Sequence, residues 1–274
     1  MIYLNGDLIK PTIFPDGTSQ IWKIDEKFLS QSLSFNTTIK WVFEHEAEFL
    51  QLAQLKDLLD STRLNNKAYV DLEITYLPYA RQDKKINNNN TFALNTFSML
   101  LNSLNFSKVT ITDPHSDAAE SVIENCVAIY PRAEVSKVFA LTESKIVAYP
   151  DEGAFRKYTK IYDHLKHFVY GEKVRDQSTG QITDYTLYGN PLGEKVLIVD
   201  DICDGGATFQ ILAGKLLSKG ALEVNLFVTH GIFSKGLRVL KDAGIKRIFT
   251  KDGEAFNDRG MVTYMPYEWS NKNE

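Results

Sequence analysis

The segment Val196–Thr208 constrains the fold more than any other part of the chain. It reads VLIVDDICDGGAT: an apolar run, two acids, and a short glycine turn that opens a helical stretch. Such a run, turning directly into a helix, is typical of a buried parallel strand and its covering helix. At this kind of turn the backbone N–H groups and the helix dipole converge on an anion. The segment therefore predicts an α/β fold that binds phosphate near residues 200–208.

Further strand-like runs alternate with helical stretches, which predicts mainly parallel sheets flanked by helices. The predicted strands are Tyr69–Leu77, Lys108–Thr112, Lys145–Tyr149, Lys195–Val199 and Glu223–Thr229. The predicted helices are Glu46–Leu59, Thr91–Leu104 and Thr208–Ser218, and Thr91 is expected to cap the second of them. The polar stretches Asn87–Asn90 and Gly171–Gly189 are predicted to be loops.

The chain has 274 residues, which exceeds a typical single domain and predicts two. Pro131 interrupts the pattern of elements, so the boundary is placed there. The expected domains are residues 1–130 and 131–274.

Composition excludes several classes of protein. The net charge is −4 and like charges are not clustered, so no nucleic-acid footprint is present. Two cysteines without metal-ligand spacing indicate neither a disulfide framework nor a zinc site. No signal peptide opens the chain, and no apolar run approaches the roughly 20 residues that span a bilayer. A cytoplasmic protein with no membrane partner is expected.

Asp200 and Asp201 follow the apolar run of the opening segment, where α/β sheets bind their ligands. Carboxylates only accept hydrogen bonds, which suits ribose hydroxyls or a metal-bound sugar. Taken alone, the segment fits an acidic surface turn equally well, because short motifs often match by chance.

Five segments together resemble the phosphoribosyl-diphosphate synthetase (ribose-phosphate pyrophosphokinase) family, and they follow the family's order. They are Phe14–Gly17 (FPDG), Tyr76–Lys84 (YLPYARQDK), Asp113–Asp117 (DPHSD), Tyr149–Ala154 (YPDEGA) and Val196–Thr208. The resemblance implies two domains like those of type I phosphoribosyltransferases. It also implies magnesium-dependent transfer of the β,γ-diphosphoryl group of ATP to the 1-hydroxyl of ribose 5-phosphate, and a homo-oligomer, either dimer or hexamer.

The resemblance also assigns roles to residues. ATP binding falls to Phe14, Asp16, Arg81, Gln82, Asp83 and His115 in the first domain. The diphosphate loop is Asp151, Glu152, Gly153 and Ala154, and the sugar-phosphate site is Asp200, Asp201, Asp204, Gly205, Gly206, Ala207 and Thr208. Lys173 and Arg175 are the implied catalytic cations, and His115 and Asp151 the implied Mg²⁺ ligands.

The residue types suit these roles. The planar guanidinium of Arg81 matches phosphate oxygens. Imidazole between two acids, as at His115, can hold a divalent ion, although a lone histidine is more often packed or solvated. Lys173 and Arg175 would neutralise charge that develops on the transferred group, unless they belong to a solvated hairpin. No residue stands out as a general base.

Two positions depart from the family pattern. Thr18 stands where relatives have an acid, and Gly205 stands where they usually have a threonine. The missing hydroxyl would contribute roughly 1.5–3 kcal/mol to binding of a charged phosphate. A looser turn could accept a substituted phosphate, so ADP-ribose, the acceptor of some phage-type relatives thought to rebuild NAD, is the alternative to ribose 5-phosphate.

Two other function classes remain to be weighed. An ordinary phosphoribosyltransferase would share residues 200–208 but would not need the PYARQD or FPDG segments. A non-catalytic regulator on the same scaffold would be expected to lose its loop cations, yet Lys173 and Arg175 are present. The presence of the PYARQD and FPDG segments and of the two loop cations favours an enzyme of nucleotide biosynthesis.

Overall fold

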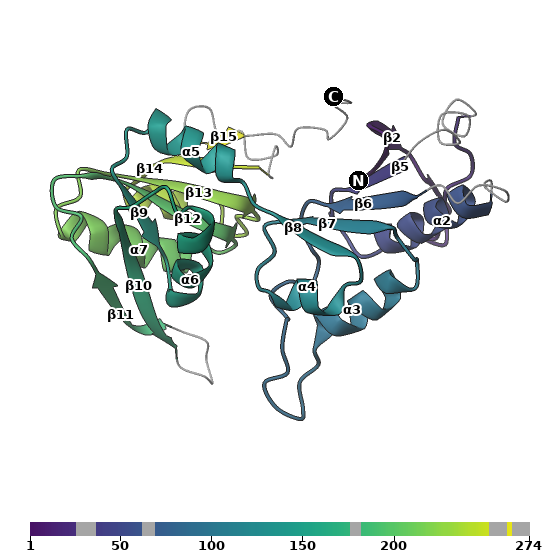
Figure 1. Ribbon diagram of the computed structural model, residues 1–274, viewed down its shortest axis with the longest axis horizontal. Coiled ribbons are helices and arrows are strands. Elements are labelled where there is room, and N and C mark those ends of the chain that lie inside the picture. Colours follow the sequence, from purple (N-terminus) through teal and green to yellow (C-terminus); the bar gives the residue numbers. More distant parts are fainter. Residues whose placement is uncertain (26–36, 62–68, 176–181, 252–261, 265–274) are drawn as a thin grey trace. The chain divides into compact units, whose positions relative to one another are not determined.

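The chain forms two α/β units (Figure 1). The computed structural model describes residues 1–25, 37–61, 69–175, 182–251 and 262–264. The first unit comprises Met1–Ile129, and the second begins at Tyr130. None of the helices in these ranges has the length and apolar character needed to cross a bilayer.

Unit 1 is built on a six-stranded sheet in which the last four strands are parallel and the first two are antiparallel. In spatial order the strands are β2 (Asp7–Ile9), β1 (Ile2–Leu4), β5 (Thr37–Trp41), β6 (Val70–Ile74), β7 (Lys108–Thr112) and β8 (Cys126–Ile129). In β6, buried Val70, Leu72 and Ile74 alternate with partly exposed Asp71 and Glu73, so this strand turns one face to the core.

Within the described residues, three helices complete unit 1: α2 (Glu48–Ser61), α3 (Ala93–Asn102) and α4 (Ala118–Val122). The periodic apolar residues of α2 and α3 are buried in the same core as β6. These are Leu52, Leu55, Leu59, Leu94, Phe97 and Leu101. Spacing of three and four residues therefore places one apolar stripe of each helix against the sheet.

Unit 2 is built on a seven-stranded sheet, parallel except for one edge strand. In spatial order the strands are β11 (Ile182–Tyr188), β10 (Phe168–Arg175), β9 (Ile146–Tyr149), β12 (Lys195–Cys203), β13 (Glu223–Gly231), β14 (Ile245–Thr250) and β15 (Val262–Tyr264). The central strands β9, β12 and β13 are almost wholly buried. This explains their continuous apolar runs.

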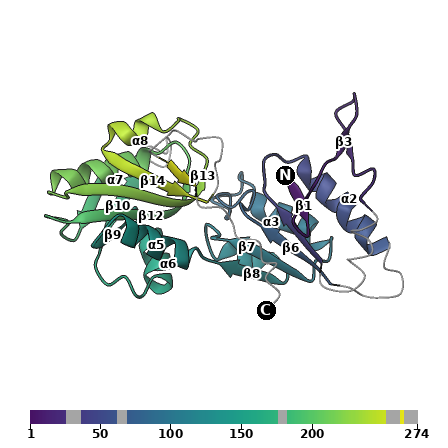
Figure 2. The ribbon, with the colours of Figure 1, turned by 90° about the horizontal axis from the view of Figure 1, so that it is seen from above.

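Helices cover both faces of this second sheet (Figure 2). On one face, α7 (Ala207–Ser218) and α8 (Arg238–Asp242) pack against Val196 and Ile198. On the other, α5 (Arg132–Leu141) and α6 (Glu152–Ile161) pack against Leu197 and Val199. Alternate residues of β12 thus face opposite layers, as a central parallel strand requires.

The predicted fold class is confirmed, whereas two local predictions are wrong. Thr91 does not cap α3, because the helix starts at Ala93 after Phe92 and has no side-chain cap. Gly171–Gly189 is largely an antiparallel hairpin of β10 and β11 and not a loop, with residues 176–181 outside the described ranges. The hairpin forms because Tyr185 and Leu187 turn inward while their polar neighbours face solvent.

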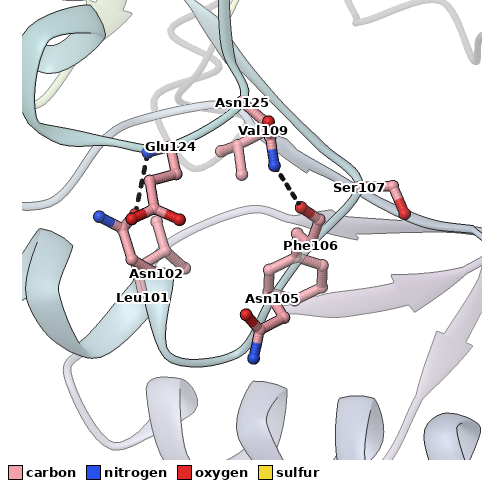
Figure 3. A pocket seen from close by; sticks show the side chains of 8 residues that line it. All are labelled: Leu101, Asn102, Asn105, Phe106, Ser107, Val109, Glu124 and Asn125. Carbon is pink, nitrogen blue, oxygen red and sulfur yellow. Dashed lines mark hydrogen bonds between the residues drawn. The ribbon is translucent and has the colours of Figure 1, made fainter.

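Unit 1 also contains a shallow polar pocket of about 230 Å³ at the amino ends of β7 and β8 (Figure 3). Asn102 binds across it, since its amide nitrogen donates to the Val122 carbonyl and its amide oxygen accepts from the Glu124 N–H, both at 3.0 Å. Asn125 similarly donates to the Phe106 carbonyl. The hydrogen bonds of Asn102 hold α3 to the connection between α4 and β8. The pocket lies at the amino ends of the strands, opposite the edge that carries the predicted binding segments.

Replacing Asn102 with alanine should therefore destabilise the protein by about 1–3 kcal/mol, because two backbone groups lose their partner. Urea unfolding followed by circular dichroism measures the change. Asn95→Ala on the same helix is the matched control, because Asn95 is exposed and its side chain makes a long hydrogen bond of 4.0 Å to the Met99 sulfur. Equal stability of the two variants would contradict this account.

Candidate active site

The sheet of unit 2 changes its winding direction between β9 and β12. The chain leaves β9 through α6 to β10 on one side, and leaves β12 through α7 to β13 on the other. The two strands pair in parallel, with Ala148 opposite Ile198. Their carboxyl ends therefore meet at a switch point, the place where open α/β sheets bind ligands. The predicted diphosphate loop follows β9, and the predicted sugar-phosphate turn ends β12.

The sugar-phosphate turn has the conformation that its glycines predict. Gly206 has φ = +76°, a left-handed conformation that favours glycine, and a Cβ there would lie 2.9 Å from a Leu240 methyl carbon. Helix α7 starts immediately afterwards, at Ala207, one residue before the predicted start at Thr208. Its first turn has no acidic residue, so its N-terminal N–H groups remain suited to an anion.

Asp200 and Asp201 lie just before this turn. Burial holds the pKa of the Asp200 carboxyl well above its usual range, and the negative charges of Asp201 and Asp151 raise it further. Asp201 is buried, accepts a hydrogen bond from the Ile202 N–H at 2.8 Å, and has the Lys157 ammonium 3.7 Å away. The acid pair therefore combines one carboxylate that has a cation nearby with one that is reluctant to ionise.

Cys203 follows the acid pair and is fully buried. Burial, together with the charges of Asp200 and Asp204, raises the pKa of its thiol to about 12. The thiol stays protonated at neutral pH, so Cys203 is a packing residue and not a nucleophile.

The diphosphate loop is held by its own acid. One oxygen of Asp151 accepts from the Ala154 N–H at 2.8 Å and caps α6, while the other accepts from the Lys173 ammonium. Glu152 points along the helix to Arg156. Gly153 leaves its N-terminal turn without a side chain, where a Cβ would lie 3.2 Å from the capping oxygen of Asp151. The capping carboxylate and Lys173 thus join two segments that are 22 residues apart in sequence.

Lys173 is positioned by the β10–β11 hairpin. Tyr185 on β11 donates a hydrogen bond to the Pro150 carbonyl at 2.8 Å and so ties the hairpin to the diphosphate loop. Its hydroxyl occupies the space beside Gly171, where a Cβ would lie only 1.8 Å from the oxygen. Arg175 lies at the end of β10 and pairs through its backbone with Ile182, and its side chain is outside the described atoms.

Unit 1 brings together two of the predicted ATP-binding segments at the carboxyl ends of β6 and β7. The Ser116 hydroxyl donates to an Asp83 carboxylate oxygen at 2.5 Å, which links DPHSD to PYARQD. Arg81, Gln82 and His115 are exposed next to this link. The turn before Arg81 is tight, since Tyr79 has φ = +62° and its carbonyl accepts from the Gln82 N–H.

Phe14 and Asp16 lie on a turn between β3 (Thr12–Ile13) and β4 (Ser19–Gln20) of unit 1. Both are exposed. Thr18, the residue that departs from the family pattern, donates to one Asp16 oxygen from its hydroxyl at 2.7 Å and from its N–H at 3.0 Å. These bonds lower the pKa of Asp16, so the threonine orients this carboxylate and keeps it ionised.

Two residues of the site were not predicted from the sequence. Lys157 approaches Asp201 from α6, and Tyr185 supports the diphosphate loop from β11. Lys157 follows the diphosphate loop by one helical turn, which was a usable signal for a cation at this edge. Tyr185 gave no signal, because its segment was assigned to a loop.

Replacing Asp200 with asparagine should stabilise the unliganded protein at pH 8. A raised carboxyl pKa means that the folded state loses stability as pH rises from the unfolded value, about 3.9, through the folded value. Asparagine removes this cost, so Tm should rise by about 2–4 °C for each kcal/mol relieved. The difference should shrink at lower pH, where the wild-type carboxyl takes up its proton.

Thermal unfolding at pH 6 and pH 8 without ligand tests this expectation. Asp242→Asn is the matched control, because Asp242 is an exposed acid on α8 whose partner is Arg238, also exposed, at 3.5 Å. A Tm for Asp200→Asn at or below that of the wild type at pH 8 would show that the site does not strain the fold.

Comparisons with known proteins agree with the geometry. Residues 150–264 match the phosphoribosyl transferase domain family. The ribose-phosphate pyrophosphokinase of Saccharolobus solfataricus is 25% identical over 260 residues, which cover 93% of this chain and 87% of that protein. The enzyme of the same name from Sulfolobus acidocaldarius is 26% identical, and the alignment covers 88% of this chain and 83% of that protein.

The fold has a close counterpart among solved structures. The crystal structure of phosphoribosylpyrophosphate synthetase from Mycobacterium smegmatis superposes with a TM-score of 0.76 at 18% identity, covering 94% of this chain and 85% of that one. This likeness supports the fold, and the two sequence relatives extend the similarity over most of the chain. Residues 150–264 carry the phosphoribosyl transferase domain, and most of the chain is similar to ribose-phosphate pyrophosphokinases.

Proposed function

We propose that this protein is a diphosphokinase-type transferase that moves the β,γ-diphosphoryl group of ATP to the anomeric 1-hydroxyl of ribose 5-phosphate. The products would be phosphoribosyl diphosphate and AMP. The family relatives named above carry this activity in their names. The observation that carries the proposal is the contact between Lys173 and Asp151 at the switch point of the unit 2 sheet.

This contact has the chemistry that diphosphoryl transfer needs. Lys173 is a cation on a strand, and the carboxylate that it meets caps the helix of the diphosphate loop. When the anionic transferred group enters, Lys173 exchanges the carboxylate for phosphoryl oxygens, whose charge increases in the transition state. Arg175, at the end of the same strand, is the proposed second cation.

The acceptor sugar is assigned to the end of β12. Asp200 and Asp201 are the proposed acceptors of hydrogen bonds from ribose hydroxyls. The 5-phosphate lies over the turn at Asp204, Gly205, Gly206, Ala207 and Thr208, at the N-terminus of α7. Since α7 is a 12-residue helix, its dipole favours the anion there.

ATP binding is assigned to unit 1. Arg81 and Gln82 are exposed beside the Asp83–Ser116 link, and their N–H donors suit phosphate oxygens. The exposed Phe14 ring and the oriented Asp16 carboxylate suit stacking and hydrogen bonding of adenine. The predicted division into an ATP-binding domain (1–130) and a sugar-phosphate and diphosphate domain (131–274) is therefore retained as part of the proposal. Association into a homo-oligomer likewise stays a prediction.

Magnesium fits the residues present. In the ranges that the structure covers, no three acidic, histidine or cysteine side chains are grouped to hold a metal by themselves. Mg²⁺ bound with nucleotides needs only one or two carboxylates, because phosphates and water complete its shell. Asp151 is a half-buried carboxylate of this kind, and His115 is an exposed second candidate in unit 1. The ion would supply neutralisation of phosphate charge.

The transfer step is an in-line displacement. The anomeric oxygen forms a bond to the β-phosphorus, the bond from that phosphorus to the α-phosphate oxygen breaks, and AMP leaves. The hydroxyl proton is released to water. The chain's own contribution is to orient the sugar through Asp200 and Asp201 and to stabilise charge through Lys173.

ADP-ribose is the alternative acceptor, and Gly205 is the observation that favours it. Gly205 offers no hydroxyl to a terminal phosphate, so the turn does not require a terminal one. ADP-ribose carries its 5-phosphate as part of a diphosphate, so the same turn could hold it. The transfer to the 1-hydroxyl would be unchanged.

Incubation of the purified protein with ATP, Mg²⁺ and either sugar should release AMP. Release should require the sugar and should be prevented by chelation of the metal, and chromatography would quantify it. The faster acceptor identifies the substrate. If neither sugar leads to AMP release, the proposal is refuted and the non-catalytic regulator is favoured.

Replacing Lys173 with alanine should lower kcat by about 10²–10³-fold, because a preorganised charge aimed at the transition state is lost. Binding of the acceptor, measured by calorimetry, should change little. Lys160→Ala, an exposed lysine on α6, is the control and should retain activity. An unchanged kcat in Lys173→Ala would remove this residue from the mechanism.

A further inference from the structure

A loop outside all of the predicted segments is attached to the sugar-phosphate turn. It begins at Gly231, the last residue of β13, and comprises residues 231–236, here called the 231–236 loop. The Cys203 carbonyl accepts hydrogen bonds from the Ile232 and Phe233 N–H groups at 2.9 and 3.0 Å. The Ser234 hydroxyl donates to an Asp204 carboxylate oxygen at 2.5 Å. Because Phe233 is also buried, the loop and the turn form one fixed unit.

Lys235 extends from this loop across Gly205. A Cβ on Gly205 would lie 3.5 Å from both the Cδ and the Cε of Lys235, which is van der Waals contact. The lysine is exposed, and its ammonium makes no hydrogen bond or ion pair with any residue that the structure describes. The ammonium lies one bond, about 1.5 Å, beyond the Cε, so a cation is held beside the backbone of the turn.

The negative charge of the turn is a reason for a cation beside it. Residues 200–208 contain three carboxylates, at Asp200, Asp201 and Asp204, and no basic residue. Helix N–H groups alone would have to hold a phosphate against these negative charges. Lys157 lies near Asp201, so its charge does not serve the phosphate. Ser234 is neutral, and its hydroxyl donates to one oxygen of Asp204.

We propose that Lys235 is a further binding residue that holds the 5-phosphoryl group of the acceptor, in place of the hydroxyl that Gly205 lacks. The inference rests on the proposed function, because it adds a residue to the same acceptor site. Lysine is a flexible point charge with three donors and does not require a terminal phosphate. It therefore serves a 5-phosphoryl group that is either terminal, as in ribose 5-phosphate, or part of a diphosphate, as in ADP-ribose.

The first test is Lys235→Ala. Loss of a hydrogen bond from a charged group should weaken acceptor binding roughly 10- to 100-fold. KM for the acceptor should rise by that factor, while KM for ATP and kcat stay within about twofold. Added salt should raise the acceptor KM of the wild type but affect the variant less, because salt screens an exposed charge. Lys241→Ala, an exposed lysine on α8, is the matched control.

The second test is rescue by a hydroxyl. The backbone at Gly205 is not in the left-handed region, so serine can be accommodated there. Gly205→Ser combined with Lys235→Ala should recover much of the lost acceptor affinity, because the phosphate regains a donor. Gly205→Ser alone should improve binding less, since the lysine stem already lies in contact with that position.

Calorimetry separates this inference from the proposed function. Each acceptor is titrated into the wild type and into Lys235→Ala without ATP, so a protein that releases no AMP still reports on Lys235. Weaker binding of either acceptor supports the inference, and the acceptor affected identifies the source of the phosphoryl group. Equal affinity in both proteins, an equal loss in Lys241→Ala, or no binding of either acceptor to the wild type would overturn it.

Discussion

Repulsion among carboxylates at the shared edge of β9 and β12 is the interaction on which the unit 2 site depends. Parallel pairing of Ala148 with Ile198 brings the ends of both strands together, and each end carries acid. Asp151 binds Lys173, and Asp201 lies near Lys157. Burial raises the pKa of Asp200, and the charges of Asp201 and Asp151 raise it further. The unliganded protein thus retains an electrostatic cost that hydroxyl donors and cations of a ligand can relieve.

A second constraint places the cation opposite these acids. Lys173 stands on a strand and not on a free loop, and the strand is fixed by the Tyr185 hydroxyl at the Pro150 carbonyl. The tyrosine reaches that carbonyl only because residue 171 has no side chain. Gly171 is therefore part of the site although it touches no predicted ligand. Substitution there would move the hairpin and, with it, the cation.

The sequence was sufficient for those parts of the fold that local pattern determines. Continuous apolar runs predicted β12 and β13, because a central parallel strand is buried on both faces. The β10–β11 hairpin was missed because its outward residues are polar and only Tyr185 and Leu187 show the inward face. Thr91 failed as a cap because α3 starts one residue beyond its reach. The approach of Lys157 to Asp201 depends on how α6 packs, which no local pattern contains.

The departure at Gly205 has a physical explanation only when the 231–236 loop is considered with it. As a single position, the glycine removes a phosphate ligand and weakens the site. In the structure, the space beside it is filled by the stem of Lys235, with carbons 3.5 Å from where a Cβ would be. A side chain at 205 would touch this stem at van der Waals distance. In the proposed acceptor site the two residues therefore act together, and the charge of Lys235 would replace the missing hydroxyl in holding a phosphate among three carboxylates.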